Sequence, residues 1–142
     1  MNDSVSLLQE VCTGCKYAVS SFGTALDYVK DDDMKRVIKK YDREHQELEK
    51  RCQAALKREG AKEKHAKILP EMMPRIGINM RLSMNDSRSH VAELMINGCN
   101  MGMKTIAKER NRNKHAAPEC VDLANEVISI ERSMMADMLK YL

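Results

Sequence analysis

Residues 5–29 read VSLLQEVCTGCKYAVSSFGTALDYV, and this stretch decides the fold. Its apolar residues follow one another in alternating steps of three and four positions: Val5, Leu8, Cys12, Cys15, Val19, Phe22, Leu26 and Val29. This spacing is typical of an α-helix that packs on neighbouring helices at a shallow angle, whereas a strand would alternate with a period of two. Because such a helix buries one face against partners, the stretch predicts a helical bundle.

The rest of the chain supplies three more helices of the same kind. We predict an all-α four-helix bundle in a single domain spanning residues 1–142, with helices at about 4–30, 33–58, 86–112 and 118–141. The inward-facing residues are Met34, Ile38, Tyr41, His45, Leu48, Cys52 and Ala55 in the second helix, Val91, Leu94, Met95, Gly98, Met101, Gly102 and Thr105 in the third, and Cys120, Ala124, Val127, Glu131, Met134, Met138 and Tyr141 in the fourth.

Turn residues set the layout of these helices. Asp31 begins the tight turn between the first two helices, Gly60 suits the end of the second, and Pro118 suits the first position of the fourth. Tight turns make the first and second helices antiparallel, and likewise the third and fourth. Residues 61–85 are apolar but contain two prolines, so we expect a long crossover packed along the bundle, with one short helix at about 70–75. The second and third helices then run parallel.

Composition excludes several classes of protein. The net charge of +3 is spread over both signs, so we expect no nucleic-acid partner. The first residues lack the basic start and apolar run of a signal peptide, and no stretch is long and apolar enough to be a membrane span. With 5 Cys, an odd number, the chain suits a reducing compartment, and we expect a cytoplasmic protein with no membrane association. The 12 Met and 0 Trp predict a core of aliphatic, Met and Cys side chains.

Counting residues from the helix ends predicts a polar layer halfway along the bundle. His45, Asn97 and Glu131 lie at similar depths in the second, third and fourth helices, and Val19 of the first helix faces His45. A buried acid is costly unless it is paired, so we expect His45 and Glu131 to meet. The pair is interpreted either as a structural contact that fixes the register of the helices or as the remnant of a metal site.

The cysteines allow two interpretations. Cys12, Cys15, Cys52 and Cys120 lie toward one end of the bundle by the same count, and Cys12 faces Cys52. In helix seams cysteine behaves as a small buried hydrophobe. Alternatively, several thiols beside methionines would suit a soft ion such as Cu(I) or Zn.

The layout of helices resembles the ferritin-like superfamily, and more closely the small bacterial ferritin-like bundles of unknown function. In metal-active members two helices each supply a Glu and the other two each supply a Glu-x-x-His pair. This sequence has Asp42-x-x-His45 in the second helix and Glu131-x-x-Met134 in the fourth, and Glu93 lies one turn from Asn97 in the third. The resemblance therefore implies a ferritin-like scaffold with a degenerate set of metal ligands.

These observations lead to two hypotheses for function. The first is a non-catalytic ferritin-like bundle with a structural or interaction role, without a cofactor, forming a homodimer or binding a protein partner. No nucleophile–base pair, phosphate loop or Gly-rich fingerprint points to an enzyme. The second is a metal-binding bundle. It would hold a single Fe, Mn or Zn ion at Asp42, His45, Glu93 and Glu131, or a soft ion such as Cu at Cys12, Cys15, Cys52 and Cys120.

Overall fold

The computed structural model describes residues 2–64 and 88–142, and within these ranges it is an all-α four-helix bundle, as predicted. The helices are α1 (Asp3–Leu26), α2 (Asp32–Arg58), α4 (Arg88–Arg112) and α5 (Pro118–Met138), followed by the short 3-10 helix η1 (Leu139–Tyr141). Most of the predicted crossover over residues 61–85, including its short helix near 70–75, lies outside the described residues.

The ends of the helices follow the capping residues. The side chain of Asn2 accepts hydrogen bonds from the first free backbone N–H groups of α1, and Asp31 does the same for α2. Gly60 ends α2 with a φ of 68°, a conformation that glycine adopts without strain. Pro118 occupies the start of α5. The places of Asp31, Gly60 and Pro118 at these helix ends agree with the prediction from the sequence.

The end of α1 differs from the prediction. The helix ends at Leu26 and not near Lys30, because the backbone tightens there: Asp27 N–H donates to Thr24 at 3.2 Å, and Tyr28 N–H donates to Ala25 at 3.0 Å. The last apolar residue of the predicted seam, Val29, is still buried, but it lies in the turn and not in the helix.

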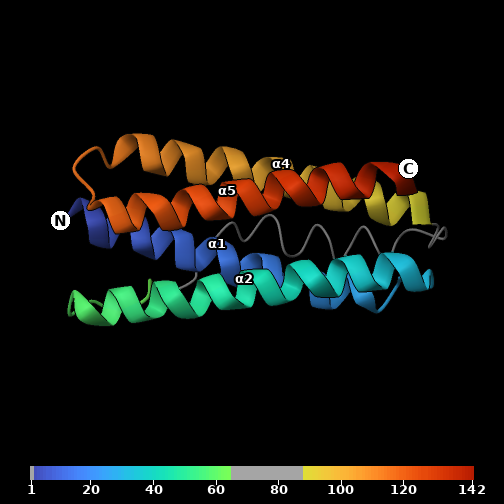
Figure 1. Cartoon of the computed structure of the whole chain (residues 1–142), viewed down its shortest axis with the longest axis horizontal. Coiled ribbons are helices and arrows are strands. Elements are labelled where there is room, and N and C mark those ends of the chain that lie inside the picture. Colours follow the sequence, from blue (N-terminus) through green and yellow to red (C-terminus); the bar gives the residue numbers. More distant parts are fainter. Residues whose placement is uncertain (1, 65–87) are drawn as a thin grey trace.

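The direction of each helix is fixed by contacts at the two ends of the bundle (Figure 1). At one end the start of α1 meets the start of α5, where the Ser4 hydroxyl accepts a hydrogen bond from Ala117 N–H at 2.7 Å. At the other end the starts of α2 and α4 meet through the ion pair of Asp31 with Arg88. Helices α1 and α5 therefore run in one direction, and α2 and α4 run in the other.

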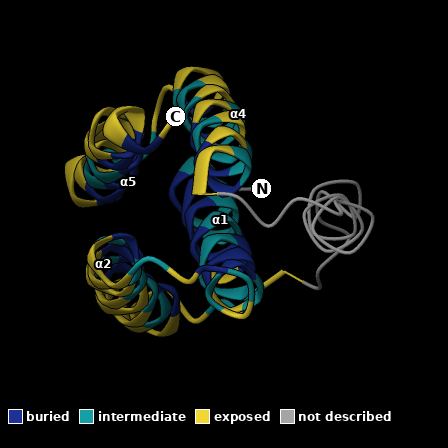
Figure 2. Ribbon diagram, turned by 90° about the vertical axis from the view of Figure 1, so that its right-hand side faces the viewer, coloured by how far each residue is buried: buried dark blue, intermediate teal, exposed yellow. Residues whose placement is uncertain are grey.

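Helix α1 contacts all three of the other helices. Viewed along the bundle, α2 and α4 lie apart, and α1 and α5 approach each other between them (Figure 2). A helix with three neighbours buries more than one seam, and α1 accordingly buries a second set of residues beyond the predicted one: Leu7, Val11 and Ala25. In α2 and α5, every residue of the predicted stripe is buried.

The hydrophobic core is divided into two clusters along the axis of the bundle. The first, near the start of α1, contains Leu7, Leu8, Val11, Leu56, Leu123 and Val127 among others. The second, near the end of α1, contains Phe22, Met34, Ile38, Val91, Met134 and Met138 among others. Aliphatic and Cys side chains occur in both clusters, as predicted. The buried Met side chains are in the second cluster, which also contains three aromatic residues: Phe22, Tyr41 and Tyr141. His45 and Glu131 occupy the positions between the two clusters on α2 and α5.

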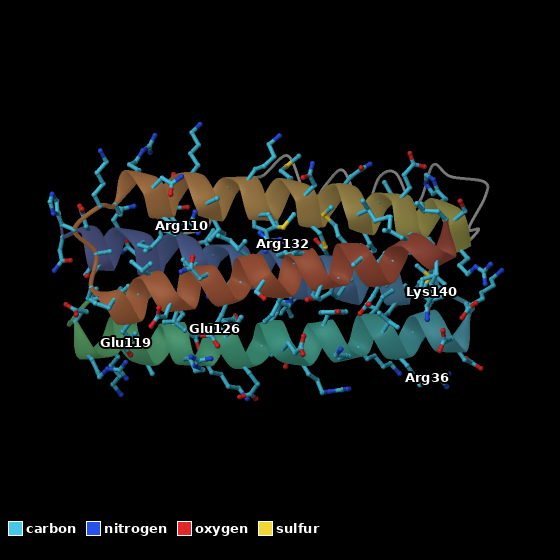
Figure 3. All side chains as sticks on the ribbon, turned by 45° about the horizontal axis from the view of Figure 1, so that its top comes forward. Arg36, Arg110, Glu119, Glu126, Arg132 and Lys140 are labelled. Atoms are coloured by element: carbon cyan, nitrogen blue, oxygen red, sulfur yellow. The ribbon has the colours of Figure 1, made fainter. Side chains whose placement is uncertain are left out.

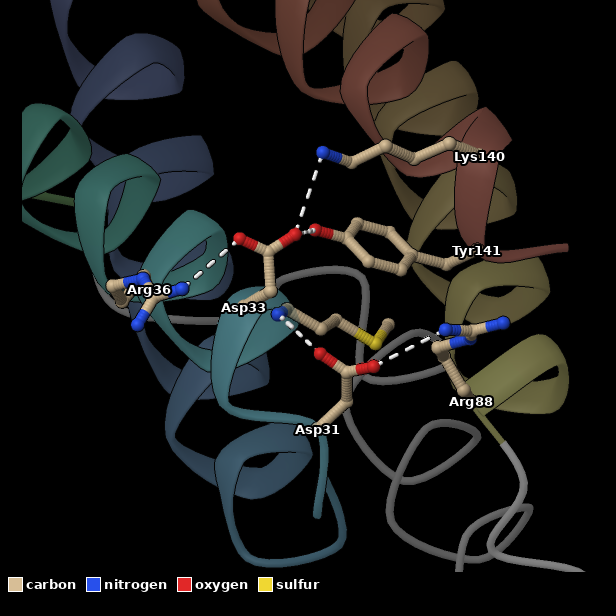
Figure 4. A network of polar contacts seen from close by, with 7 residues as sticks. Asp31, Asp33, Arg36, Arg88, Lys140 and Tyr141 are labelled. Atoms are coloured by element: carbon tan, nitrogen blue, oxygen red, sulfur yellow. Dashed lines mark hydrogen bonds and ion pairs between the residues drawn. The ribbon is translucent and has the colours of Figure 1, made fainter.

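A polar network fastens the C-terminal end of the chain to the start of α2 (Figure 4). The Tyr141 hydroxyl donates to Asp33 Oδ2 at 2.6 Å, and Arg36 and Lys140 also contact this carboxylate. Together the Tyr141 hydroxyl, Arg36 and Lys140 lower the pKa of Asp33 to about 2. Asp33 therefore remains charged, and the contact remains intact, well below neutral pH.

Charged side chains cover the outside of the bundle (Figure 3). On this surface, ion pairs join α2 to α5: Arg51 binds Glu126 through both terminal guanidinium nitrogens, at 2.7 and 3.0 Å, and Arg58 binds Glu119. The side chains of these pairs are about half-exposed to solvent, so each pair adds little to the free energy of folding. Their main effect is on how the two helices are placed beside each other.

Candidate functional site

The candidate site is the polar pair at mid-bundle. His45 of α2 has none of its surface exposed, and Glu131 of α5 has 6% exposed. The Nε2 atom of His45 lies 3.1 Å from Glu131 Oε1, and its Nδ1 atom lies 2.7 Å from the backbone oxygen of Tyr41. The predicted contact of His45 with Glu131 is therefore present.

The surroundings of His45 determine where its protons lie. The Tyr41 oxygen is a carbonyl and can only accept, so Nδ1 carries a proton. Burial lowers the pKa of His45, but the hydrogen bond with Glu131 and the attraction of its carboxylate outweigh burial, and the net pKa is raised above 6.5. The contact with Glu131 thus favours the protonated form of the His45 ring over the neutral form.

Three further residues complete the layer. The thiol of Cys99 in α4 is hydrogen-bonded to Glu131. The ring of Phe22 in α1 meets the His45 ring edge-on, with the centroids 5.0 Å apart. Gly102 leaves room for the acid, because a Cβ at that position would lie 3.3 Å from Glu131 Oε1. The polar atoms of the layer are therefore paired with one another and enclosed by apolar side chains.

The membership of this layer corrects two predictions. Asn97 is exposed, and Cys99 takes the predicted place of Asn97 beside Glu131. The depth count was right, but α4 is rotated about its axis relative to the prediction. In α1, Val19 is only half-buried, and Phe22, three residues further on, contacts His45. Cys99 belongs to a buried stripe with seven-residue spacing, Ala92, Cys99 and Ile106, and this spacing was the signal in the sequence.

The remaining predicted ligands of a hard metal do not join the pair. Asp42 is half-buried and its Oδ1 accepts a hydrogen bond from Gln46 at the surface, at 3.0 Å. Because the buried stripe of α2 runs through Tyr41 and His45, Asp42 lies on its flank. Glu93 is exposed on α4. Across residues 2–64 and 88–142, no group of three or more His, Cys, Asp or Glu side chains is arranged to hold a metal ion.

The four cysteines predicted to cluster lie in the same part of the core, but two of their thiols are hydrogen-bonded to other groups. Cys12 and Cys52 face each other across the contact of α1 with α2, as the depth count predicted. Cys12 also donates to Glu63 Oε1 at 2.7 Å, and Cys52 donates to the Leu8 carbonyl at 3.1 Å. Cys15 lies one helical turn from Cys12, in the same core cluster.

Three thiols of this cluster, those of Cys12, Cys15 and Cys120, are held in their protonated form. The neighbouring Cys52 thiol, followed by burial and the contact with Glu63, raises the pKa of Cys12 far above its usual value of 9.0. Burial is the first cause of the raised pKa of Cys15 and of Cys120. Because the thiolate and not the thiol is the metal ligand and nucleophile, these side chains are inert as they stand.

Glu63 was not identified from the sequence. It follows α2 in a short extended segment and joins that segment to both helices: Lys16 binds its carboxylate at 2.7 Å, and Gln53 donates to it at 2.8 Å. The carboxylate keeps a pKa of about 2, because the hydrogen bonds from Cys12, Lys16 and Gln53 outweigh the opposing effect of burial. No local pattern marks Glu63, since its partners lie far from it in the sequence.

The raised pKa of His45 predicts how stability depends on pH. The folded chain keeps a proton that the unfolded chain releases near pH 6.5, so the pair stabilises the fold fully below that pH. The stabilisation is lost as the pH rises through the higher pKa of the folded state. Urea unfolding from about pH 6 to about pH 9 should show a falling free energy of unfolding. The slope should disappear when His45→Leu and Glu131→Met are combined, and an unchanged slope in that variant would assign the effect to another group.

Two helical glycines provide a matched test of the space around Glu131. Nothing lies within 4 Å of a Cβ built on Gly23, so Gly23→Ala should stabilise the protein by about 0.5–1 kcal/mol, the usual helix preference for alanine. Gly102→Ala should bring no such gain, because its Cβ would press on the Glu131 carboxylate. Thermal unfolding of both variants measures the difference. Equal stabilisation would mean that Glu131 does not pack on Gly102.

The fold and the site together define the class: an all-α four-helix bundle with a buried, internally paired polar layer. Comparisons with models of protein families, with curated proteins and with solved structures find no match for this chain. Among the helices of the described ranges, none combines the length and hydropathy needed to cross a membrane.

Proposed function

We propose that the protein is a non-catalytic ferritin-like bundle with a structural or interaction role, in which the mid-bundle pair sets the register of the helices. One observation supports this proposal most strongly: the polar groups of the mid-bundle layer are paired with one another. Both ring nitrogens of His45 have partners, and Glu131 is bonded to His45 and Cys99. A pair of this kind fixes one arrangement of helices, because any shift along the axis would leave a buried charge unpaired.

The ferritin-like relationship is supported by the directions of the helices. The end of α2 and the start of α4 lie at opposite ends of the bundle, as in folds with one long crossover (Figure 1). The ligand pairs of the metal-active members are incomplete, since the acid of Asp42-x-x-His45 lies at the surface and Glu131 is followed by Met134 where a His would stand. We infer a scaffold that keeps the connectivity without the dinuclear chemistry.

Location and partners are part of the same proposal. All five cysteines are free and buried, which suits the reducing conditions of the cytoplasm. The apolar, Met-rich composition of residues 61–85 supports contact with a second copy of the chain or another protein. Sedimentation over a range of micromolar concentrations tests the homodimer, and a strict monomer throughout would contradict it.

The alternative is a metal-binding bundle, and one observation favours it. The Tyr41 carbonyl holds Nδ1 of His45 and directs Nε2 at the acid, which is how metal-ligating histidines are commonly oriented. Metal analysis of protein purified without chelator, followed by titration with Fe, Mn, Zn and Cu(I), separates the two functions. We expect no stoichiometric metal. A bound ion that is lost both in His45→Ala and in the double variant His45→Leu with Glu131→Met would overturn the structural role proposed for the pair.

A further inference from the structure

The contact between α1 and α2 brings two thiols together near the end of the bundle where α1 begins. The Cys52 thiol donates to the backbone oxygen of Leu8 at 3.1 Å. In an α-helix that oxygen also accepts from the N–H four residues later, which belongs to Cys12. Cys52 is therefore seated against the backbone of Cys12, and the two side chains lie in the same core cluster. Each side chain is at most 1% exposed, so neither has a competing partner in solvent.

We propose that Cys12 and Cys52 form a redox-modification site, at which a low-molecular-weight disulfide such as oxidised glutathione converts the dithiol into a disulfide joining α1 to α2. The site is separate from the His45 layer and goes beyond the proposed function. In the first step the Cys12 thiol loses its proton, its sulfur attacks the small disulfide, and the leaving thiolate takes up that proton. In the second step the Cys52 sulfur, after losing its own proton, attacks Cys12 and displaces the second small thiol. The protein gives up two electrons and two protons, and the small disulfide becomes two thiols.

Glu63 controls access to the first step. Its carboxylate accepts the Cys12 proton at 2.7 Å and is itself held by Lys16 and Gln53. The segment that carries it is also tied to α1, where Gln9 donates to the Lys62 carbonyl at 2.9 Å. A negative charge on Cys12 would face this carboxylate, so the thiolate forms readily only when Glu63 moves away. The dithiol is therefore stable under reducing conditions and becomes reactive when the segment opens.

The pairing is specific to these two cysteines. Cys99 is hydrogen-bonded to Glu131 at mid-bundle, and Cys120 at the start of α5 lies beside Ser4. Cys15 lies one turn further along α1, whereas the backbone oxygen that seats Cys52 belongs to Leu8, in the same turn as Cys12. Once formed, the bridge would remove one of the three side-chain hydrogen bonds to Glu63 and leave those from Lys16 and Gln53.

The test treats the full folded chain with oxidised glutathione and follows its intact mass under non-reducing conditions. We expect the loss of two hydrogen atoms without a lasting glutathione adduct, and peptide mapping should place the bridge between Cys12 and Cys52. The melting temperature should rise and return to its starting value with dithiothreitol, because the bridge restricts the unfolded chain. Because this test uses the wild-type chain, its outcome does not depend on whether a variant folds. A bridge between other cysteines would overturn the proposal. So would a folded chain whose mass stays unchanged under conditions that oxidise the urea-unfolded chain.

Three variants separate the parts of the proposal. Cys120→Ala should oxidise like the wild type, whereas Cys52→Ala should stop at the unmodified chain or at a glutathione adduct. Glu63→Gln keeps the shape of the side chain but removes its charge, so it should oxidise several times faster than the wild type at the same pH. An unchanged rate in Glu63→Gln, with circular dichroism showing the same fold, would overturn the role of Glu63 in controlling access.

Discussion

Replacing His45 with alanine should lower the free energy of unfolding by about 3–5 kcal/mol, because it leaves a buried carboxylate without its partner. Glu131 has 6% of its surface exposed and keeps only the weak thiol donor of Cys99 when the imidazole is removed. The change also opens space beside Phe22, whose ring packs on His45. Urea unfolding of the two proteins at neutral pH measures the loss.

The double variant His45→Leu with Glu131→Met is the matched control for this result. Both charges disappear together, and apolar side chains of similar size join the two halves of the core. Stability should return to about that of the wild type or above it, as it does when buried ion pairs are replaced by hydrophobic residues. A His45→Ala protein as stable as the wild type would show that the ring is solvated, which would contradict the buried layer.

The second large effect should come from α1, which contacts all three of the other helices. Leu7 is fully buried in the first core cluster, and Leu7→Ala should cost about 2–5 kcal/mol through lost burial and the cavity left behind. Leu139→Ala is the control, since that side chain is 58% exposed and its truncation should change stability by less than about 0.5 kcal/mol. Chemical denaturation of both variants gives the comparison. Similar small losses would mean that α1 is not central to the core.

Where one face of a helix is clearly apolar, the sequence was enough to predict which residues are buried. The stripes of α2 and α5 are flanked by charged residues, so only one rotation of each helix hides the apolar side chains. In α4, apolar residues occur on more than one side, and the pattern does not determine its rotation. The depth of the polar layer was therefore predicted correctly, but Asn97 was placed where Cys99 lies.

The parts of the site that were missed depend on distant neighbours. Phe22 takes the place of Val19 beside His45: both lie on the predicted seam, and the residue count misplaced the depth of α1 by one step of that seam. Glu63 contacts α1 only because the segment after α2 folds back onto that helix. No local periodicity in the sequence predicts this contact. By contrast, the pairing of Cys12 with Cys52 follows from counting along two helices joined by a short turn, and it was predicted.

The most direct test of the structural role of the mid-bundle pair is a ¹⁵N NMR titration of the His45 ring. If the pair is closed as the structure shows, the ring should titrate above 6.5, retain its Nδ1 proton throughout, and show no change when Zn or Fe(II) is added. A ring that titrates at its ordinary pKa, or whose Nε2 signal shifts on adding metal at stoichiometric concentration, would contradict a self-contained structural pair.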